Sequence, residues 1–276
     1  MLSKPIEIIR KRGSCRSFAR QAINPETTAQ LNTFIDEVNK EAASLGIRFQ
    51  LVDRLNDAGK PIEKLGTYGV ISGAQTFIAG IVPKNDADAC QFGYWFEKII
   101  LCATELGLAT CWLGGSFNRA DFGRKIVLSD QKFIPIVSPV GYAAEKRSVM
   151  ENLVRRAAKS STRLPFSDLF SIQDGQTRLD TEKAGQWAVP LEMVQLGPSA
   201  SNKQPWRVVI SDSGLDFYLA RTTGYASLGF DMQMNDIGIA MCHFELSARE
   251  LGLPGSWQKL NPAERPGLVY VTTWVI

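Results

Sequence analysis

The chain has 276 residues, of which 45% are hydrophobic and 21% are charged, and its 31 Lys and Arg residues exceed its 28 Asp and Glu residues by three. These proportions are typical of a soluble globular protein that buries a core without disulfides or structural metals. The length predicts one large or two small domains. A net charge of +3 is too weak to indicate a nucleic-acid-binding protein by itself.

Several missing features restrict the chemistry further. His243 is the only histidine, so Ser-His and Cys-His nucleophile pairs and His-rich metal sites would all have to depend on it. The five cysteines are scattered without a CxxC spacing, which indicates reduced thiols in a cytoplasmic protein. No GxGxxG, Walker or GxSxG motif is present, and no apolar run approaches 18 residues. We therefore expect no metal site, no membrane segment, and chemistry that a bound cofactor supplies.

The first half of the chain predicts alternating helices and strands. In chain order we expect a helix capped by Ser3 that runs from Pro5 toward Gly13, a helix that opens at Pro25, strands over 48–52 and 76–82, a long apolar helix over 92–106 and a buried strand over 133–142. Residues 143–175 are basic and irregular, which indicates a connector.

The second half predicts a similar series. We expect a helix from 181 to about 196, a loop over 198–205, strands over 206–211 and 216–220, a long apolar helix over 232–251 and a closing strand over 268–276. The segments 101–112 and 246–257 share seven of twelve residues at a constant offset of 145. A repeat of this length indicates a duplicated domain, and two similar halves would pack about a pseudo-two-fold axis.

Three segments could carry chemistry, and each also has a purely structural interpretation. Segment 12–18, Arg-Gly-Ser-Cys-Arg-Ser-Phe, could chelate a phosphate or could be a solvated basic helix end. Segment 112–117, Trp-Leu-Gly-Gly-Ser-Phe, lets backbone approach a flat ligand or is a plain loop. Segment 198–206, Pro-Ser-Ala-Ser-Asn-Lys-Gln-Pro-Trp, is a polar loop whose Ser and Asn side chains could bind a ligand or stabilise turns.

These segments together resemble the FMN-dependent nitroreductase family. The Arg-x-Ser-x-Arg-x-Phe segment is similar to the family's phosphate-binding opening, PSASNKQPW to its PSSxNxQPW loop, LGLATCWLGG to its helix-to-Gly loop, and Thr-Arg-Leu-Pro over 162–165 to its Arg-Leu-Pro. Family members are usually homodimers with two flavin sites at the interface. Here both sets of motifs lie in one chain, which resembles the fused, single-chain nitroreductase-like proteins of the TM1586 type.

The resemblance implies an α+β, nitroreductase-like fold with two duplicated halves, each a mostly antiparallel sheet flanked by helices, packed as a pseudo-dimer. Half one would be residues 1–165 and half two residues 166–276. The FMN phosphate would be bound by Arg12, Ser14, Arg16 and Arg163, the isoalloxazine edge would face Gly114 and Gly115, and half two would contribute Ser199, Ser201 and Asn202. One FMN per chain and a monomer would follow.

The implied activity is transfer of electrons from NADH or NADPH through FMN to a nitroaromatic or quinone-like acceptor in a ping-pong scheme, without a protein nucleophile. His243, off the apolar stripe of its helix, is interpreted as a packed, hydrogen-bonded residue. Two alternatives remain: a flavin-binding or regulatory module without reductase activity, and a nucleic-acid-binding protein that uses Lys146, Arg147, Arg155, Arg156 and Lys159.

Overall fold

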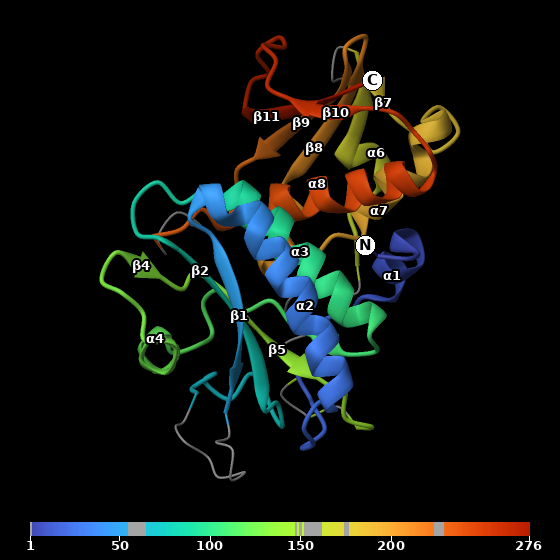
Figure 1. Ribbon diagram of the computed structural model, residues 1–276. Coiled ribbons are helices and arrows are strands. Elements are labelled where there is room, and N and C mark those ends of the chain that lie inside the picture. The colour runs from blue at the N-terminus through green and yellow to red at the C-terminus, as the bar shows by residue number, and fades with distance from the viewer. Residues whose placement is uncertain are drawn as a thin grey trace.

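The computed structural model describes residues 2–54, 65–146, 148, 151, 162–173, 177–223 and 229–276. Two sheets lie on either side of a central helical layer formed by α3 (Ala89–Glu105) and α8 (Met232–Glu250) (Figure 1). All strands of the first sheet precede residue 142 and all strands of the second follow residue 169. The architecture is α+β, with one sheet in each half of the chain, as expected for two duplicated halves.

The first sheet has five strands and is buried on both faces. Its elements, with the helices around it, are α1 (Pro5–Lys11), α2 (Pro25–Ala42), η1 (Ala43–Leu45), β1 (Arg48–Asp53), β2 (Thr76–Pro83), α3, β3 (Ala109–Thr110), α4 (Arg119–Ile126), β4 (Lys132–Phe133) and β5 (Val137–Gly141). The order is β1-β2-β5-β3, all antiparallel, and β4 also pairs with β2. A core that includes Phe77 and Phe122 fills the face beneath α4.

The second sheet has six strands and packs one face on α7 and α8. Its half contains α6 (Phe166–Leu169), β6 (Phe170–Ile172), β7 (Thr177–Arg178), η2 (Gly185–Trp187), α7 (Ala188–Gln195), η3 (Ala200–Asn202), β8 (Trp206–Ser211), β9 (Gly214–Ala220), α8, β10 (Ser256–Gln258) and β11 (Leu268–Val275). The order is β10-β11-β9-β8-β6-β7. All pairs are antiparallel except β6 with β8.

Most predicted elements are present, with four differences. The connector predicted over 143–175 contains α6 and β6 at its C-terminal end. Ser3 is not the cap of α1, because Lys4 occupies that position and the Ser3 hydroxyl donates to Glu105 at 2.5 Å. The strand expected over 133–142 is divided into β4 and β5, and its register on β2 shifts by one residue around Pro135. The helix expected from residue 181 begins as turns, with regular α-helix only from Ala188.

The two long helices cross at a pair of glycines. A Cβ on Gly93 would collide with the carbonyl oxygen of Asn235, and a Cβ on Gly238 would collide with the carbonyl oxygen of Cys90. Each half-one residue in these contacts precedes its half-two counterpart by 145 positions, so the contacts are reciprocal, as at an isologous interface. Residues that correspond in the sequence repeat therefore make corresponding contacts at the helix crossing.

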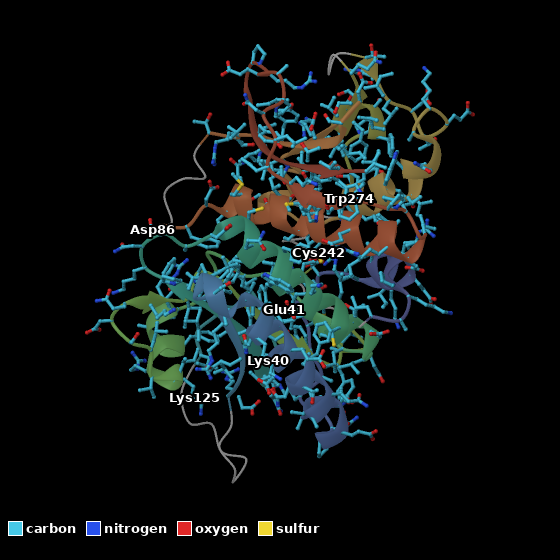
Figure 2. The ribbon with its side chains drawn as sticks, turned by 45° about the horizontal axis from the view of Figure 1, so that its top comes forward. Lys40, Glu41, Asp86, Lys125, Cys242 and Trp274 are labelled. Carbon is cyan, nitrogen blue, oxygen red and sulfur yellow. The ribbon has the colours of Figure 1, made fainter. Side chains whose placement is uncertain are left out.

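Because α8 lies between the two halves, most of its circumference is buried rather than one stripe. Figure 2 shows Cys242 in this central layer and Trp274 in the second sheet, both with 0% exposure, while Lys40 and Lys125 lie on outer helices. Within the described ranges, no helix is both long and apolar enough to cross a lipid bilayer.

Candidate functional site

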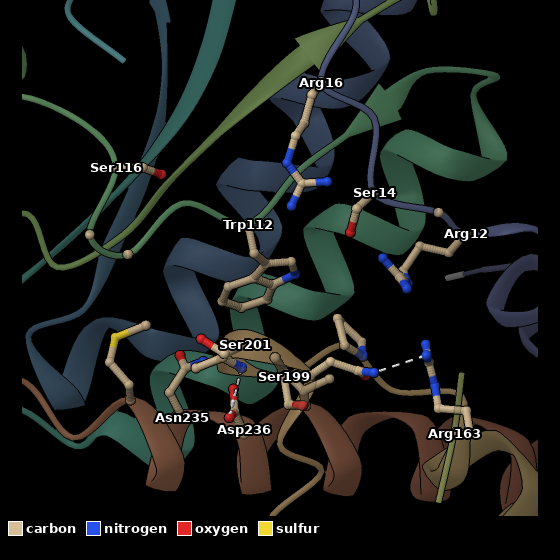
Figure 3. A pocket seen from close by; sticks show the side chains of 18 residues that line it. Arg12, Ser14, Arg16, Trp112, Ser116, Arg163, Ser199, Ser201, Asn235 and Asp236 are labelled. Atoms are coloured by element: carbon tan, nitrogen blue, oxygen red, sulfur yellow. Dashed lines mark hydrogen bonds between the residues drawn. The ribbon is translucent and has the colours of Figure 1, made fainter. Parts of the chain in front are cut away.

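A pocket of about 530 Å³ opens between the two halves, above the N-terminal half of α8 (Figure 3). Half one supplies one wall, and half two supplies the floor. All nine cofactor-binding residues predicted from the sequence line it: Arg12, Ser14, Arg16, Gly114, Gly115, Arg163, Ser199, Ser201 and Asn202. Residues that are up to 190 positions apart in the chain are therefore brought into one cavity.

The segment after α1 supplies the basic wall. The N–H of Arg12 ends α1 by donating to the Ile8 carbonyl at 2.8 Å. The chain then runs along β3, where the N–H of Cys15 donates to the Thr110 carbonyl at 2.8 Å. This attachment directs the Arg12 and Arg16 side chains into the pocket, as Figure 3 shows.

The guanidinium nitrogens of this wall are poorly satisfied by the protein. Arg12 Nε and Arg16 Nε and Nη1 are buried, and none has a hydrogen-bond partner within the described part of the chain. Buried donors without partners are costly, at roughly 1–3 kcal/mol each and more when charged. An anionic ligand in the pocket would supply the missing acceptors.

The glycine loop forms the other end of the same wall. Arg119 stabilises this loop, because its Nη2 donates to the Gly114 carbonyl at 2.7 Å and its Nε to the Ile134 carbonyl at 3.1 Å. A Cβ on Gly114 would collide with the methyl group of Met232, whereas a Cβ on Gly115 would meet nothing within 4 Å. A side chain at position 114 would therefore have to displace the flexible end of Met232, which also lines the pocket.

The polar loop of half two forms the floor and is fastened to α8. The N–H of Ala200 donates to Asp236 Oδ2 at 3.0 Å, and the N–H of Gln204 donates to Ser199 Oγ at 2.8 Å. Ser201 and Asn202 have left-handed backbone angles, with φ of 49° and 55°. The turn chemistry foreseen for this loop is thus present, and the same loop lines the pocket.

Arg163 joins the two halves at the arginine end of the pocket. Its Nη2 donates to the Leu196 carbonyl at 3.1 Å, and its Nη1 donates to Asn202 Oδ1 at 3.4 Å (dashed in Figure 3). Burial, followed by the nearby positive charge of Arg12, lowers the pKa of Arg163. Like charges held together in a partly desolvated pocket favour binding of an anion.

Asp236 is the one carboxylic acid among the described residues that line the pocket, and it is 2% exposed. Desolvation raises the pKa of Asp236 well above that of an ordinary carboxyl, which favours its neutral form. Burial therefore weakens the tendency of this carboxyl to offset the charge of the three arginines.

His243 is packed and hydrogen-bonded in the interior, as expected for it. Its Nδ1 lies 2.8 Å from the Met193 carbonyl oxygen, and its Nε2 lies 2.9 Å from Glu97 Oε1. Glu97 also accepts from Trp112 Nε1 at 2.8 Å and lies 3.7 Å from Arg12 Nε. His243 is thus connected to two lining residues of the pocket without lining it.

Sequence reasoning missed several residues of this site. Asn235 and Asp236 line the floor, Arg119 holds the glycine loop, and Glu97 lies behind Arg12. Asn235 and Asp236 could have been identified from the sequence, because they are adjacent polar residues near the start of an otherwise apolar helix. The roles of Arg119 and Glu97 depend on contacts between distant segments, which no local pattern reveals.

The position related to the glycine loop by the internal repeat is different. At the same offset of 145, Lys259 and Leu260 stand where half one has Gly114 and Gly115. Lys259 Nζ donates to the Val271 carbonyl at 2.6 Å and lies over the Tyr270 ring. The second half therefore has two side chains at the positions where the first half has two glycines.

Two further predictions are only partly covered by the structure. Of the basic residues proposed for nucleic-acid binding, Lys146 is described, whereas Arg147, Arg155, Arg156 and Lys159 lie outside the described residues. Across the described ranges, no group of three or more His, Cys, Asp or Glu side chains is arranged to hold a metal ion.

Comparison with known protein families identifies the family of this chain. A model of the family described as "Putative TM nitroreductase" matches residues 4–248. The chain belongs to this family. The nitroreductase family is one of oxidoreductases, so the assignment made from the motifs is confirmed at that level.

A solved structure with a TM-score above 0.5 confirms the nitroreductase-like fold, and two further structures are less similar. A "putative nitroreductase" from Thermotoga maritima shares 19% identity at a TM-score of 0.60, covering 99% of this chain and 94% of its own. A nitroreductase family protein from Clostridium difficile shares 22% identity at a TM-score of 0.44, covering 60% of this chain and 96% of its own. A nitroreductase with bound FMN from Desulfitobacterium hafniense shares 17% identity at a TM-score of 0.41, covering 53% of this chain and 93% of its own. No curated protein matches the sequence.

Proposed function

We propose that this protein is an FMN-dependent oxidoreductase that uses NADH or NADPH to reduce nitroaromatic or quinone-like acceptors, with one FMN bound between its halves. The observation that carries the proposal is the convergence of three half-buried arginines and the Gly114–Gly115 backbone in one pocket. The residues fit this cofactor, because an anion would supply hydrogen-bond acceptors to the Arg12 and Arg16 nitrogens that have none among the described residues, and the glycine loop leaves room for a flat ring.

The residues that would hold the cofactor fall into two groups. At the arginine end, Arg12, Ser14, Arg16 and Arg163 would bind the phosphate through charge-assisted hydrogen bonds. At the other end, Gly114 and Gly115 would face the ring, and Ser199, Ser201 and Asn202 would contact it or the ribityl chain from half two. The site would then need both halves of one chain, as a family homodimer needs two subunits.

The chemistry that FMN supplies when bound is acceptance of a hydride from NADH or NADPH, followed by reduction of the acceptor in a ping-pong sequence. The protein's own contribution is binding, orientation and positive charge. Asp236 fixes the loop that carries Ser199 and Ser201, because it accepts a hydrogen bond from the Ala200 N–H. No nucleophilic side chain is needed at the site.

The proposal is tested by replacing the two arginines of the basic wall. We expect Arg12→Ala combined with Arg16→Ala to purify without FMN and to regain little on incubation with it. Arg124→Ala, at a guanidinium that lies outside the pocket on α4, is the matched control and should retain FMN. Full flavin occupancy in the double variant would refute the phosphate assignment.

A regulatory flavin-binding role is the remaining alternative. It predicts the same FMN content, so the discriminating measurement is the absorbance of the bound flavin during anaerobic addition of NADH or NADPH. Bleaching at catalytically useful rates supports the reductase, and a flavin that stays oxidised supports the regulatory module.

A further inference from the structure

The Glu97 and His243 pair lies directly behind the arginine end of the pocket. Both side chains have 0% exposure, and the Arg12 side chain has 6%. Glu97 belongs to α3 in half one, and His243 belongs to α8 in half two. A buried carboxylate 3.7 Å from Arg12 Nε would by itself neutralise the guanidinium that the pocket needs as a cation.

The hydrogen-bond pattern determines how many protons the pair holds. The Met193 carbonyl can only accept, so His243 Nδ1 carries a hydrogen. At 2.9 Å, Nε2 and Glu97 Oε1 require one proton between them, because two lone pairs would otherwise face each other. Wherever that proton resides, the pair has a net charge of zero.

We propose that His243 is a positioning residue that cancels the charge of Glu97 and thereby leaves Arg12 available to an anion in the pocket. This inference rests on the proposed function, since it takes the phosphate of FMN as that anion. Glu97 still orients the wall, because Trp112 Nε1 donates to its second oxygen at 2.8 Å. The role assigned to His243 is therefore electrostatic and acts through Arg12.

The charge argument makes a specific prediction for substitutions. In His243→Leu or His243→Gln the carboxylate of Glu97 loses its neutralising partner, while Arg12 Nε still lies 3.7 Å away and the Trp112 indole still donates to it. Arg12 then pairs with Glu97 and interacts less with the phosphate. Adding Glu97→Gln removes the competing carboxylate, so the double variant should bind phosphate as the wild type does.

The experiment compares FMN with riboflavin, which lacks the phosphate. Dissociation constants are measured by quenching of flavin fluorescence for the wild type, both His243 variants, Glu97→Gln and the His243→Leu/Glu97→Gln double variant. We expect the preference for FMN over riboflavin to fall about tenfold in the His243 variants, the effect of weakening one charged hydrogen bond. The preference for FMN should remain in Glu97→Gln and return to within about threefold of wild type in the double variant. If the substitutions acted by disturbing the structure, the double variant would instead bind less well than either single variant.

The outcomes separate this inference from the proposed function. A wild type with no preference for FMN over riboflavin would refute the phosphate assignment and this inference with it. A wild-type preference that persists in His243→Gln, or that the double variant fails to recover, would overturn the role of His243 alone. If His243→Leu does not fold, His243→Gln and Glu97→Gln still decide the question, since loss of the preference in Glu97→Gln would also contradict the charge argument.

Discussion

Gly93 of α3 and Gly238 of α8 lie at the crossing of the two central helices, each against the backbone of the opposite helix. Because the helices meet without side chains between them at this point, the two halves approach closely, and the pocket lies at the N-terminal end of α8 beside the crossing. The duplication seen in the sequence thus determines where the site lies.

Replacing either glycine with alanine should push the two helices apart and destabilise the protein. We expect Gly93→Ala or Gly238→Ala to lower the free energy of unfolding by roughly 1–3 kcal/mol or more, because each Cβ would meet backbone that cannot move aside. Gly123→Ala is the control, since Gly123 is in helix α4, where an added Cβ has only Leu128 nearby, at 3.9 Å. That variant should be neutral or more stable by about 0.5–1 kcal/mol. Urea denaturation distinguishes them, and equal stabilities would contradict the packing described.

The backbone conformation of the polar loop predicts that two substitutions of Ser201 differ in stability. Ser201 has φ 49° and ψ 28°, a left-handed conformation that β-branched residues adopt with difficulty. We expect Ser201→Val to lower the free energy of unfolding by roughly 1–2 kcal/mol, whereas Ser201→Gly should be tolerated. Denaturation curves for the pair measure the difference. Valine and glycine variants of equal stability would show that this residue is not held in the left-handed region.

Asp236 predicts a pH-dependent stability. Because burial raises its pKa in the folded protein, the folded state binds more protons than the unfolded state above about pH 4, and stability falls as the pH rises. Asp236→Asn removes this loss while keeping an acceptor for the Ala200 N–H. The stability of the variant relative to wild type should therefore increase toward neutral pH, with a limiting slope of about 1.4 kcal/mol per pH unit.

Asp180→Asn provides a control of opposite sign. The N–H of Lys183 donates to Asp180 Oδ1 at 2.8 Å and lowers the pKa of that carboxyl. Its contribution to stability is present above the unfolded pKa, so this variant should lose stability relative to wild type as the pH rises. Thermal melts of both variants at several pH values test the pair. If the stability of Asp236→Asn and that of wild type changed with pH in parallel, a raised pKa of the buried Asp236 would be contradicted.

Much of the fold could be predicted because its main elements follow local rules. α2 opens at Pro25, with the Asn24 side chain accepting from the Thr27 N–H at 2.7 Å, and β8 and the long α8 follow apolar runs. Helix α4 was not predicted, because it is short and mostly polar. Its one strong signal is Asn118, whose side chain caps the helix.

The divided strand over 133–142 shows how tertiary pairing changes a local prediction. The run is apolar enough for one strand, but Pro135 has no N–H for the ladder and coincides with the one-residue register shift on β2. In the site, too, contacts between distant segments could not be predicted from local patterns. Motifs predicted the three arginines and both loops, whereas Glu97 behind Arg12 became visible only when α3 and α8 were placed together.

The most direct test of the account is the amount of flavin released per chain from the purified protein, measured by absorbance and identified by chromatography. The account predicts one FMN per chain, because Gly114 and Gly115 leave one ring site open while Lys259 and Leu260 occupy the related position. Two FMN per chain would contradict the single site between the halves. No FMN, even after incubation with the cofactor, would contradict the proposed oxidoreductase itself.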